Sequence, residues 1–314
     1  MAKAPSISLN NGLKMPSFGL GTYKSIGEAD SAIKHAIDVG YRHFDTARIY
    51  VNEEEVGKAI QGKIKEGVVK REEIFIVTKL WNTDHEPEKV EKACRQSCEK
   101  LGLGYIDLYL MHWPVAFKER TPFEYGPRTP DGQYDHADVD YLDTWKAMEK
   151  LVDLGLVKSI GISNFNSQQI DRLLDNCRIK PVNNQIECSP QFNQKKLIKY
   201  CQDRDITVTA FCPLGKQNPA ENKPAFLYDA KLGDVAKKYN KTVPQIVFRY
   251  LLEIGTVPIP KSVTPSRIEE NISVFDFKLT DDEIKYIDTL NTCERVVPFI
   301  ESRNDKHFPF GIEF

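Results

Sequence analysis

His43-Phe44-Asp45-Thr46-Ala47-Arg48-Ile49-Tyr50 begins as a short apolar strand and breaks into a loop that carries a carboxylate and a phenol. Asn52-Glu53-Glu54-Glu55-Val56 follows and predicts the start of a helix. In parallel α/β folds, ligands and catalytic groups lie at the carboxyl ends of the strands. Asp45 and Tyr50 are therefore the first candidate functional residues, to be judged by the residues that end the other strands.

The same succession of strand, loop and helix recurs along the chain. Eight short apolar segments predict strands at residues 17–23, 43–47, 74–80, 106–112, 157–164, 182–187, 207–214 and 256–261. Amphipathic helical patterns such as PEKVEKACRQSCEKLG separate them, and several end in a glycine that suits a helix C-cap. Eight such units over roughly 250 residues predict a (β/α)8 TIM barrel. A doubly wound open sheet is the alternative, although no G-x-G-x-x-G follows the first strand.

Segments outside this succession are expected to cover the two ends of the barrel. Together with the barrel they are predicted to form a single domain of residues 1–314. Residues 6–15 hold two short apolar pieces around Asn11-Gly12 and predict an N-terminal β-hairpin that plugs one end. Residues 114–140, 215–229 and 291–314 predict long loops over the C-terminal mouth, where they would shape the substrate pocket.

Composition narrows the class of partner. The 43 basic and 45 acidic residues nearly balance, which favours a small molecule over nucleic acid or an anionic membrane. The seven cysteines form no C-x-x-C and no Cys/His array, so we expect no metal site and a reducing, cytoplasmic location. No apolar run is long enough to span a membrane, and Met1-Ala2-Lys3-Ala4-Pro5 lacks a hydrophobic signal core.

Polar or aromatic residues end most of the predicted strands, and they are Asp45, Lys79, His112, Asn164, Gln185 or Glu187, Phe211 and Lys261. Lys79 and Asp45 come from neighbouring strands and can form a buried ion pair, which is equally compatible with a purely structural role. A nearby ammonium is expected to lower the pKa of the Tyr50 phenol from its ordinary value of about 10, which favours proton donation. His112 is then expected to orient a carbonyl oxygen beside the Tyr50 hydroxyl, although a lone histidine is more often structural.

A second cluster follows the eighth strand, where Lys261, Ser262, Thr264 and Arg267 precede and enter a predicted helix. Helix N-termini carry free amides and a partial positive charge, and phosphate sites follow strands seven and eight in many barrels. Ordinary N-capping accounts for the two hydroxyls but leaves Lys261 and Arg267 unexplained. A nucleotide with an additional phosphate accounts for all four residues.

From the hairpin to the C-terminal tail, the chain resembles the aldose-reductase-like branch of the aldo-keto reductases. The matching motifs are GLGTYK, GYRHFDTARIYVNEEEVGKAI, VTKLW, LGLGYIDLYLMHWP, IGISNF, NNQIE and IPKSVTPSRIEEN. The resemblance implies a barrel that binds NADPH (NADP+) across its mouth and reduces aldehydes or ketones to alcohols by hydride transfer. It also implies Tyr50 as proton donor, Lys79 and Asp45 as its tuning pair, and His112 as the residue that orients the carbonyl.

The resemblance further implies the binding residues. The expected cofactor-binding residues are Gly21, Thr22, Tyr23, Asp45, Ser163, Asn164, Gln185, Phe211, Cys212, Pro213, Leu214, Lys261, Ser262, Val263, Thr264, Arg267, Glu270 and Asn271. Among these, Ser163, Asn164 and Gln185 are expected to bond the nicotinamide carboxamide, and Lys261 and Arg267 to meet the 2′-phosphate. The expected substrate pocket consists of Tyr23, Arg48, Tyr50, Trp81, His112, Trp113, Phe123 and Phe299, whose aromatic walls suit apolar or sterol-like carbonyl compounds.

The chain also departs from the common pattern of this branch. Phe211 and Tyr23 stand where a tyrosine and a tryptophan are usual, and Asn218 stands near where an aspartate often clasps the pyrophosphate. We therefore expect a looser closure of the 215–229 loop over the cofactor.

Two other functions stay open: a Schiff-base lyase that uses Lys79, and a non-catalytic cofactor-binding or structural relative. Relatives are often monomers, so a monomer is expected.

Overall fold

Eight parallel strands form a closed barrel in the computed structural model, which describes residues 4–314. They are β3 (Leu20–Gly21), β4 (His43–Asp45), β5 (Phe75–Leu80), β6 (Leu108–Met111), β7 (Ile160–Ser163), β8 (Asn183–Glu187), β9 (Thr207–Phe211) and β10 (Thr256–Pro258). Each strand pairs with the next along the chain, and one observed strand lies in each predicted segment. Met1-Ala2-Lys3, the start of the segment expected to lack a signal core, lies outside the described residues.

The barrel closes between its first and last strands. The amides of Gly19 and Gly21 donate to the carbonyls of Pro258 and Pro260 at 3.1 and 3.0 Å. A side chain at Gly21 would not fit this seam, because an added Cβ would lie 2.8 Å from the carbonyl oxygen of Ile259. The TIM-barrel prediction is therefore confirmed, and the open doubly wound sheet, which leaves two unpaired edges, is excluded.

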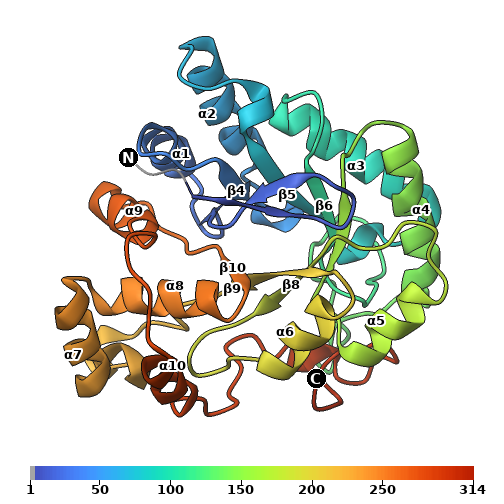
Figure 1. Cartoon of the computed structure of the whole chain (residues 1–314). Helices are drawn as coiled ribbons and strands as arrows, with labels where there is room; N and C mark the ends of the chain where they lie inside the picture. The colour runs from blue at the N-terminus through green and yellow to red at the C-terminus, as the bar shows by residue number, and fades with distance from the viewer. Residues whose placement is uncertain (1–3) are drawn as a thin grey trace.

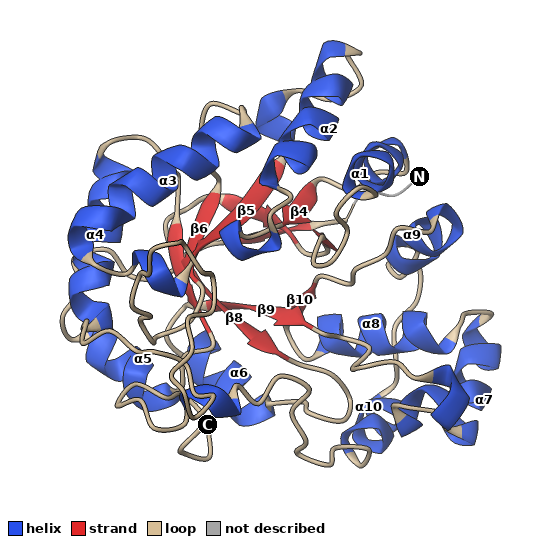
Figure 2. Cartoon of the chain, turned by 180° about the vertical axis from the view of Figure 1, so that it is seen from behind, coloured by secondary structure: helices blue, strands red, loops and turns tan. Residues whose placement is uncertain are grey.

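Helices surround the strands, as Figures 1 and 2 show from opposite sides. They are α1 (Ala29–Asp38), α2 (Glu53–Lys65), α3 (Pro87–Leu101), α4 (Tyr141–Asp153), α5 (Ser167–Leu174), α6 (Lys195–Gln202), α7 (Ala230–Tyr239), α8 (Val243–Glu253), α9 (Pro265–Ile272) and α10 (Asp281–Asp288). Short 3-10 helices are η1 (Arg48–Tyr50), η2 (Arg71–Glu73), η3 (Asn82–Asp84), η4 (Pro219–Glu221), η5 (Ala225–Tyr228) and η6 (Ile300–Ser302). The predicted glycine C-cap of α3 is confirmed, because Gly102 follows it with φ +61°.

The N-terminal hairpin consists of β1 (Ser6–Ser8) and β2 (Lys14–Pro16), which pair antiparallel around a turn at Gly12. Leu9 and Met15 are buried and pack against Val182, which precedes β8, and against side chains from the barrel strands, namely Phe75, Val77, Leu108, Leu110 and Val257. The hairpin therefore plugs the end of the barrel opposite the strands' carboxyl ends, as predicted, and Figure 1 shows it crossing the strands.

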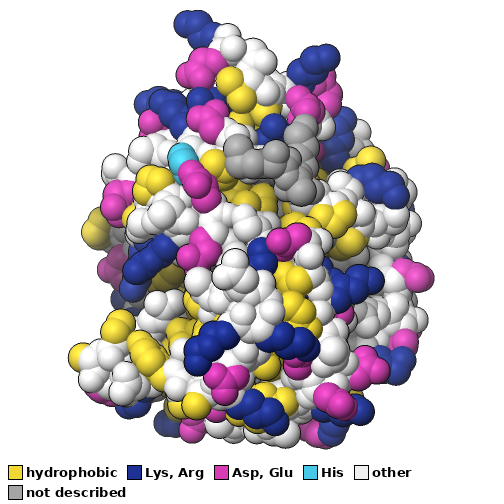
Figure 3. Space-filling model, turned by 60° about the vertical axis from the view of Figure 1, so that its left-hand side comes forward, with side chains coloured by type: hydrophobic (Ala, Val, Ile, Leu, Met, Phe, Trp, Pro, Cys, Tyr) yellow, Lys and Arg dark blue, Asp and Glu magenta, His cyan; other side chains and the backbone are white. Residues whose placement is uncertain are grey.

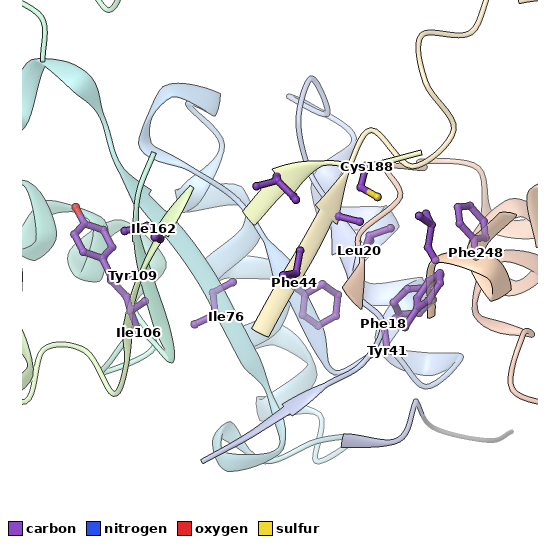
Figure 4. Packing of buried hydrophobic residues seen from close by; sticks show 14 of the residues in the cluster. Phe18, Leu20, Tyr41, Phe44, Ile76, Ile106, Tyr109, Ile162, Cys188 and Phe248 are labelled. Atoms are coloured by element: carbon purple, nitrogen blue, oxygen red, sulfur yellow. The ribbon is translucent and has the colours of Figure 1, made fainter. Parts of the chain in front are cut away.

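The main apolar core lies between the strands and the helices (Figure 4). The Phe18 ring centroid lies 5.9 Å from that of Tyr41 and 5.6 Å from that of Phe248, both in edge-to-face contact. Each fully buried apolar side chain of this size stabilises the fold by about 1.5–3 kcal/mol. The buried Tyr41 hydroxyl donates to the carbonyl of Ile268 at 2.9 Å, so the phenol costs little to bury.

The three long intervals lie at the mouth of the barrel, on the side that faces the reader in Figure 2. Tyr134, Gln217 and Phe299, one from each interval, line the central cleft. The prediction that these loops shape the pocket is thus confirmed. No helix among residues 4–314 combines the length and apolar character needed to cross a membrane.

Candidate active site

A cleft opens at the carboxyl ends of the strands and encloses about 1380 Å³, counting the part open to solvent. Polar and aromatic side chains from most strands converge on it. The predicted residues that line it are Gly21, Thr22, Tyr23, Asp45, Tyr50, Trp81, His112, Trp113, Ser163, Asn164, Gln185, Phe211, Cys212, Pro213, Leu214, Lys261 and Phe299.

A buried ion pair lies at the base of the cleft. The Lys79 ammonium, on β5, donates to Asp45 Oδ1 at 2.6 Å and to the carbonyl of Thr46 at 2.8 Å. Gln185, on β8, donates to the other carboxylate oxygen of Asp45 at 2.8 Å. Burial lowers the pKa of Lys79, and the adjacent Asp45 carboxylate opposes this shift. The predicted ion pair is therefore present, and three strands hold it.

Tyr50 ends η1, directly after β4. Its ring centroid lies 5.1 Å from Lys79 Nζ, 5.0 Å from the Tyr23 ring and 5.9 Å from the His112 ring. Burial, followed by the charge of Asp45, raises the pKa of Tyr50 well above its ordinary value. The expected lowering of this pKa is wrong for the free protein, because desolvation dominates and Lys79 directs two of its ammonium hydrogens to Asp45 and Thr46. The phenol therefore keeps its proton at neutral pH.

His112 follows β6, and its backbone amide donates to the carbonyl of Leu80 at 3.2 Å. Its ring centroid lies 5.2 Å from that of Trp81, which fixes the imidazole at the cleft wall. Burial, followed by the charge of Lys79, lowers the pKa of His112 well below its ordinary value. The imidazole is therefore neutral at physiological pH and carries one N–H that can donate to an oxygen.

An amide cluster stands across the cleft, where β7 and β8 end. The Ser163 hydroxyl donates to the carbonyl of Gln185 at 2.8 Å, and Asn164 Nδ2 donates to the carbonyl of His112 at 3.0 Å. Asn164 Oδ1 and Gln185 Oε1 have no hydrogen-bond donor among residues 4–314. Two unpaired acceptors that line a cleft suit a carboxamide NH2 group, so this donor set fits a nicotinamide.

The second predicted cluster lies where β10 leads into α9. Thr264, the N-cap of α9, makes no side-chain capping bond, and Ser262 Oγ instead accepts from the Thr264 amide at 3.2 Å. Lys261 and Arg267 are exposed, and neither has a carboxylate partner in the described part of the chain. The structure therefore does not support ordinary capping as the explanation, and this helix N-terminus with two unpaired cations fits a phosphate.

Some predicted site residues lie elsewhere. Arg48 was expected in the pocket wall, but its Nε lies 2.9 Å from Asp84 Oδ2 and its Nη1 donates to Gln96 at 2.7 Å, so these partners hold it outside the cleft. Phe123, also expected in the pocket wall, does not line the cleft; its side chain is 44% exposed and packs on Tyr125. The residues of the second cluster that do not line the cleft are Ser262, Val263, Thr264, Arg267, Glu270 and Asn271.

Sequence reasoning missed several residues of the cleft wall. The additional residues are Ile49, Tyr134, Gly215, Gln217, Ile259, Pro260 and Val297. Ile259 and Pro260 belong to the motif IPKSVTPSRIEEN and could have been found from it. Tyr134 and Val297 lie in intervals that were predicted to shape the pocket, but those intervals have no periodic pattern that marks individual wall residues.

Comparisons with known proteins agree with this geometry. A sequence model of the Aldo/keto reductase family matches residues 15–292. The chain is 47% identical over 319 residues to aldo-keto reductase family 1 member A1-A of Danio rerio, with 97% of this chain and 98% of the relative covered. It is 46% identical over 318 residues to aldo-keto reductase family 1 member D1 of Mus musculus, with 98% and 97% covered.

Solved structures give the same result. The aldose reductase of Schistosoma japonicum matches with a TM-score of 0.93 and 43% identity, covering 99% of this chain and 100% of that chain. The Bombyx mori aldo-keto reductase in complex with NADP matches with a TM-score of 0.90 and 42% identity, covering 98% and 100%. The chain therefore belongs to the aldo/keto reductase family and is an oxidoreductase that acts on carbonyl groups.

Proposed function

We propose that the protein is an NADPH-dependent carbonyl reductase that converts aldehydes and ketones to alcohols, with Tyr50 as the proton donor. The convergence of protonated Tyr50, neutral His112 and the buried Lys79–Asp45 pair at one cleft carries this proposal. The Bombyx mori relative solved in complex with NADP supports the predicted cofactor.

Residues of the cleft and of the adjoining β10–α9 segment suit the two ends of NADPH. Asn164 and Gln185 would bond the nicotinamide carboxamide through their unpaired oxygens, with the Phe211 ring beside it. Lys261 and Arg267 would meet the 2′-phosphate near the N-terminus of α9. When bound, NADPH supplies hydride to the carbonyl carbon.

The chain's own residues act on the carbonyl oxygen. The neutral imidazole of His112 donates a hydrogen bond that orients this oxygen beside Tyr50. As negative charge develops there, Tyr50 transfers its hydroxyl proton to the oxygen, and acid catalysis of this kind contributes roughly a hundred- to ten-thousand-fold. The Lys79 ammonium, 5.1 Å from the ring centroid, stabilises the phenolate that remains. A proton from bulk solvent, relayed by water in the open cleft, then restores the Tyr50 hydroxyl.

The substrates are apolar or aromatic aldehydes and ketones, including sterol-like ketones. Trp81, Trp113 and Phe299 wall the cleft, and each is at least nine-tenths buried. Trp113 and Phe299 stack with ring centroids 3.9 Å apart and planes inclined by 16°. Flat aromatic walls of this kind favour ligands that bury apolar surface.

A coenzyme comparison tests the proposal. The wild type should reduce an aromatic aldehyde with NADPH. Lys261→Met should raise the Kd for NADPH by about tenfold or more, because one charge-assisted contact to the 2′-phosphate is lost. The Kd for NADH, which lacks this phosphate, should change little. Lys285→Met, an exposed lysine of α10, is the matched control and should change neither. An equal loss of affinity for both coenzymes would show that Lys261 does not meet the 2′-phosphate.

Trapping of a covalent substrate adduct distinguishes the reductase from the alternative Schiff-base lyase. Lys79 is fully buried and its hydrogens are engaged by Asp45 and Thr46, which opposes its use as a nucleophile. Borohydride treatment with a carbonyl substrate should therefore leave no adduct on Lys79, and an adduct there would favour the lyase. Tight NADPH binding without turnover of any aldehyde or ketone would instead favour a non-catalytic relative.

We further propose that residues 1–314 form one domain that acts as a monomer in the cytoplasm. All seven cysteines are free, which supports a reducing compartment. On the face drawn in Figure 3, basic and acidic side chains are interspersed, which supports a small-molecule partner over nucleic acid or a membrane. Size-exclusion chromatography with light scattering would give the mass of one chain if the monomer proposal is correct.

A further inference from the structure

The C-terminal tail forms one wall of the cleft but has few polar ties to the barrel near that wall. Val297 and Phe299 line the cleft. Within the described residues, Glu187 is the side chain of the barrel that bonds to the backbone of residues 295–300. The next tie lies one residue earlier, where Gln191 donates to the carbonyl of Glu294 at 3.3 Å.

Glu187 is the last residue of β8 and lies two positions after Gln185, so both side chains point to the same face of the strand. One carboxylate oxygen accepts from the amide of Val296 at 2.5 Å, and the other accepts from the amide of Val297 at 2.9 Å. Glu187 is only 2% exposed. Burial raises its pKa, and the two amide bonds and Arg295 oppose this shift.

The backbone conformation of the tail requires contacts that hold it in place. Phe299, two residues beyond Val297, adopts φ +50°, a left-handed conformation that non-glycine residues rarely occupy. Backbone of this kind persists only where surrounding contacts hold it. The Glu187 carboxylate holds the backbone before Phe299, and the Phe299 ring stacks on Trp113. Beyond Phe299, the amide of Tyr134 donates to the carbonyl of Glu301 at 3.1 Å.

We propose that Glu187 is a positioning residue that determines substrate specificity, because it fixes the tail backbone and so places Val297 and Phe299 at the substrate end of the cleft. The residue touches neither the reacting carbonyl nor the cofactor. The proposal rests on the reductase function proposed above for the same cleft. A bulky substrate meets this wall and depends on Glu187, whereas a small aldehyde that occupies only the space beside Tyr50 and His112 does not.

Steady-state kinetics of Glu187→Gln test this inference, because glutamine keeps the size of the side chain but replaces one acceptor by an NH2 group. The KM for 2-naphthaldehyde should rise about tenfold, the effect expected when a charge-assisted hydrogen bond is lost. The KM for propanal, both kcat values and the Kd for NADPH should change less than about twofold. Glu294→Gln, an exposed carboxylate in the same tail, is the matched control and should behave as the wild type.

A second comparison separates positioning from a general loss of structure. Phe299→Ala removes the wall directly and should raise the KM for 2-naphthaldehyde in the wild type, but add little in the Glu187→Gln background. Additive effects of the two substitutions would overturn the proposal. So would an equal rise of KM for both aldehydes, or a joint fall of kcat and NADPH affinity, since these indicate a disturbed barrel.

Hydrogen exchange of the backbone amides in residues 294–300 reports on the hydrogen bonds to Glu187 independently of catalysis. Exchange at Val296 and Val297 should be faster in Glu187→Gln than in the wild type, and an unchanged rate would overturn the proposal. A wild type that reduces neither aldehyde would overturn the reductase function itself, and the exchange result distinguishes that failure from a failure of the tail tie.

Discussion

Replacing Lys79 by methionine should destabilise the protein severely, because it leaves the Asp45 carboxylate buried without its cation. Methionine keeps most of the side-chain length and removes the donors to Asp45 Oδ1 and to the Thr46 carbonyl, 2.6 and 2.8 Å away. Gln185 remains as a neutral donor to the other carboxylate oxygen. Breaking a buried ion pair by removing one partner costs about 3–5 kcal/mol, and we expect a loss of stability in this range.

A double-mutant cycle shows whether the cost comes from the unpaired charge. Asp45→Asn in the Lys79→Met background removes that charge, so the double variant should be about 1–3 kcal/mol more stable than the sum of the two single losses predicts. Urea unfolding followed by circular dichroism gives these values, and Lys237→Met, an exposed lysine of α7, is the control that should unfold as the wild type. A loss below about 1 kcal/mol for Lys79→Met, or strict additivity, would refute the reasoning.

Two further predictions concern packing and pH. Gly57→Ala should lower the melting temperature, because the added Cβ would lie 2.1 Å from the carbonyl oxygen of Leu101 and overpacking costs about 1–3 kcal/mol. At Gly62, in the same helix, an added Cβ would meet only the end of a flexible lysine at 3.5 Å. Gly62→Ala should therefore raise the melting temperature, since alanine favours a helix by about 1 kcal/mol. A higher melting temperature for Gly57→Ala than for Gly62→Ala would contradict the packing of α2 on α3. The profile of kcat/KM against pH should show no break near the ordinary histidine value of about 6.5, because burial and Lys79 keep His112 neutral well below that pH. A break near 6.5 that His112→Gln abolishes would show that this imidazole titrates in the working range.

The barrel and the four residues of the proposed proton-transfer site could be predicted from the sequence for one physical reason. Parallel strands all present their carboxyl ends at the same edge, so residues far apart in the chain meet there once the strands are identified. Asp45 ends β4, Lys79 is the penultimate residue of β5, and His112 directly follows β6. Tyr50 lies in the loop after β4. Their proximity follows from the topology alone.

Properties that depend on long-range partners could not be predicted in this way. The direction of the Tyr50 pKa shift depends on burial and on where the Lys79 hydrogens point, and strand order reveals neither. Arg48 leaves the pocket because Asp84 and Gln96, from other elements, bind its guanidinium.

The tail shows the same limit. Glu187 was visible as a strand-end residue beside Gln185, but its partners lie 109 and 110 residues further on, at the amides of Val296 and Val297. Backbone amides are present at every residue except proline, so no side-chain motif marks the two that it binds. Only the folded chain brings that segment against β8.

The most direct test of the proposed function is NADPH fluorescence titration and turnover of a simple aromatic aldehyde, in the wild type and in Tyr50→Phe. Phenylalanine keeps the ring contacts with Tyr23 and His112 and removes only the hydroxyl. We predict an unchanged Kd for NADPH and a fall in turnover of roughly a hundred- to ten-thousand-fold. Turnover within about tenfold of the wild type would contradict Tyr50 as the proton donor, because a general acid contributes roughly a hundredfold or more.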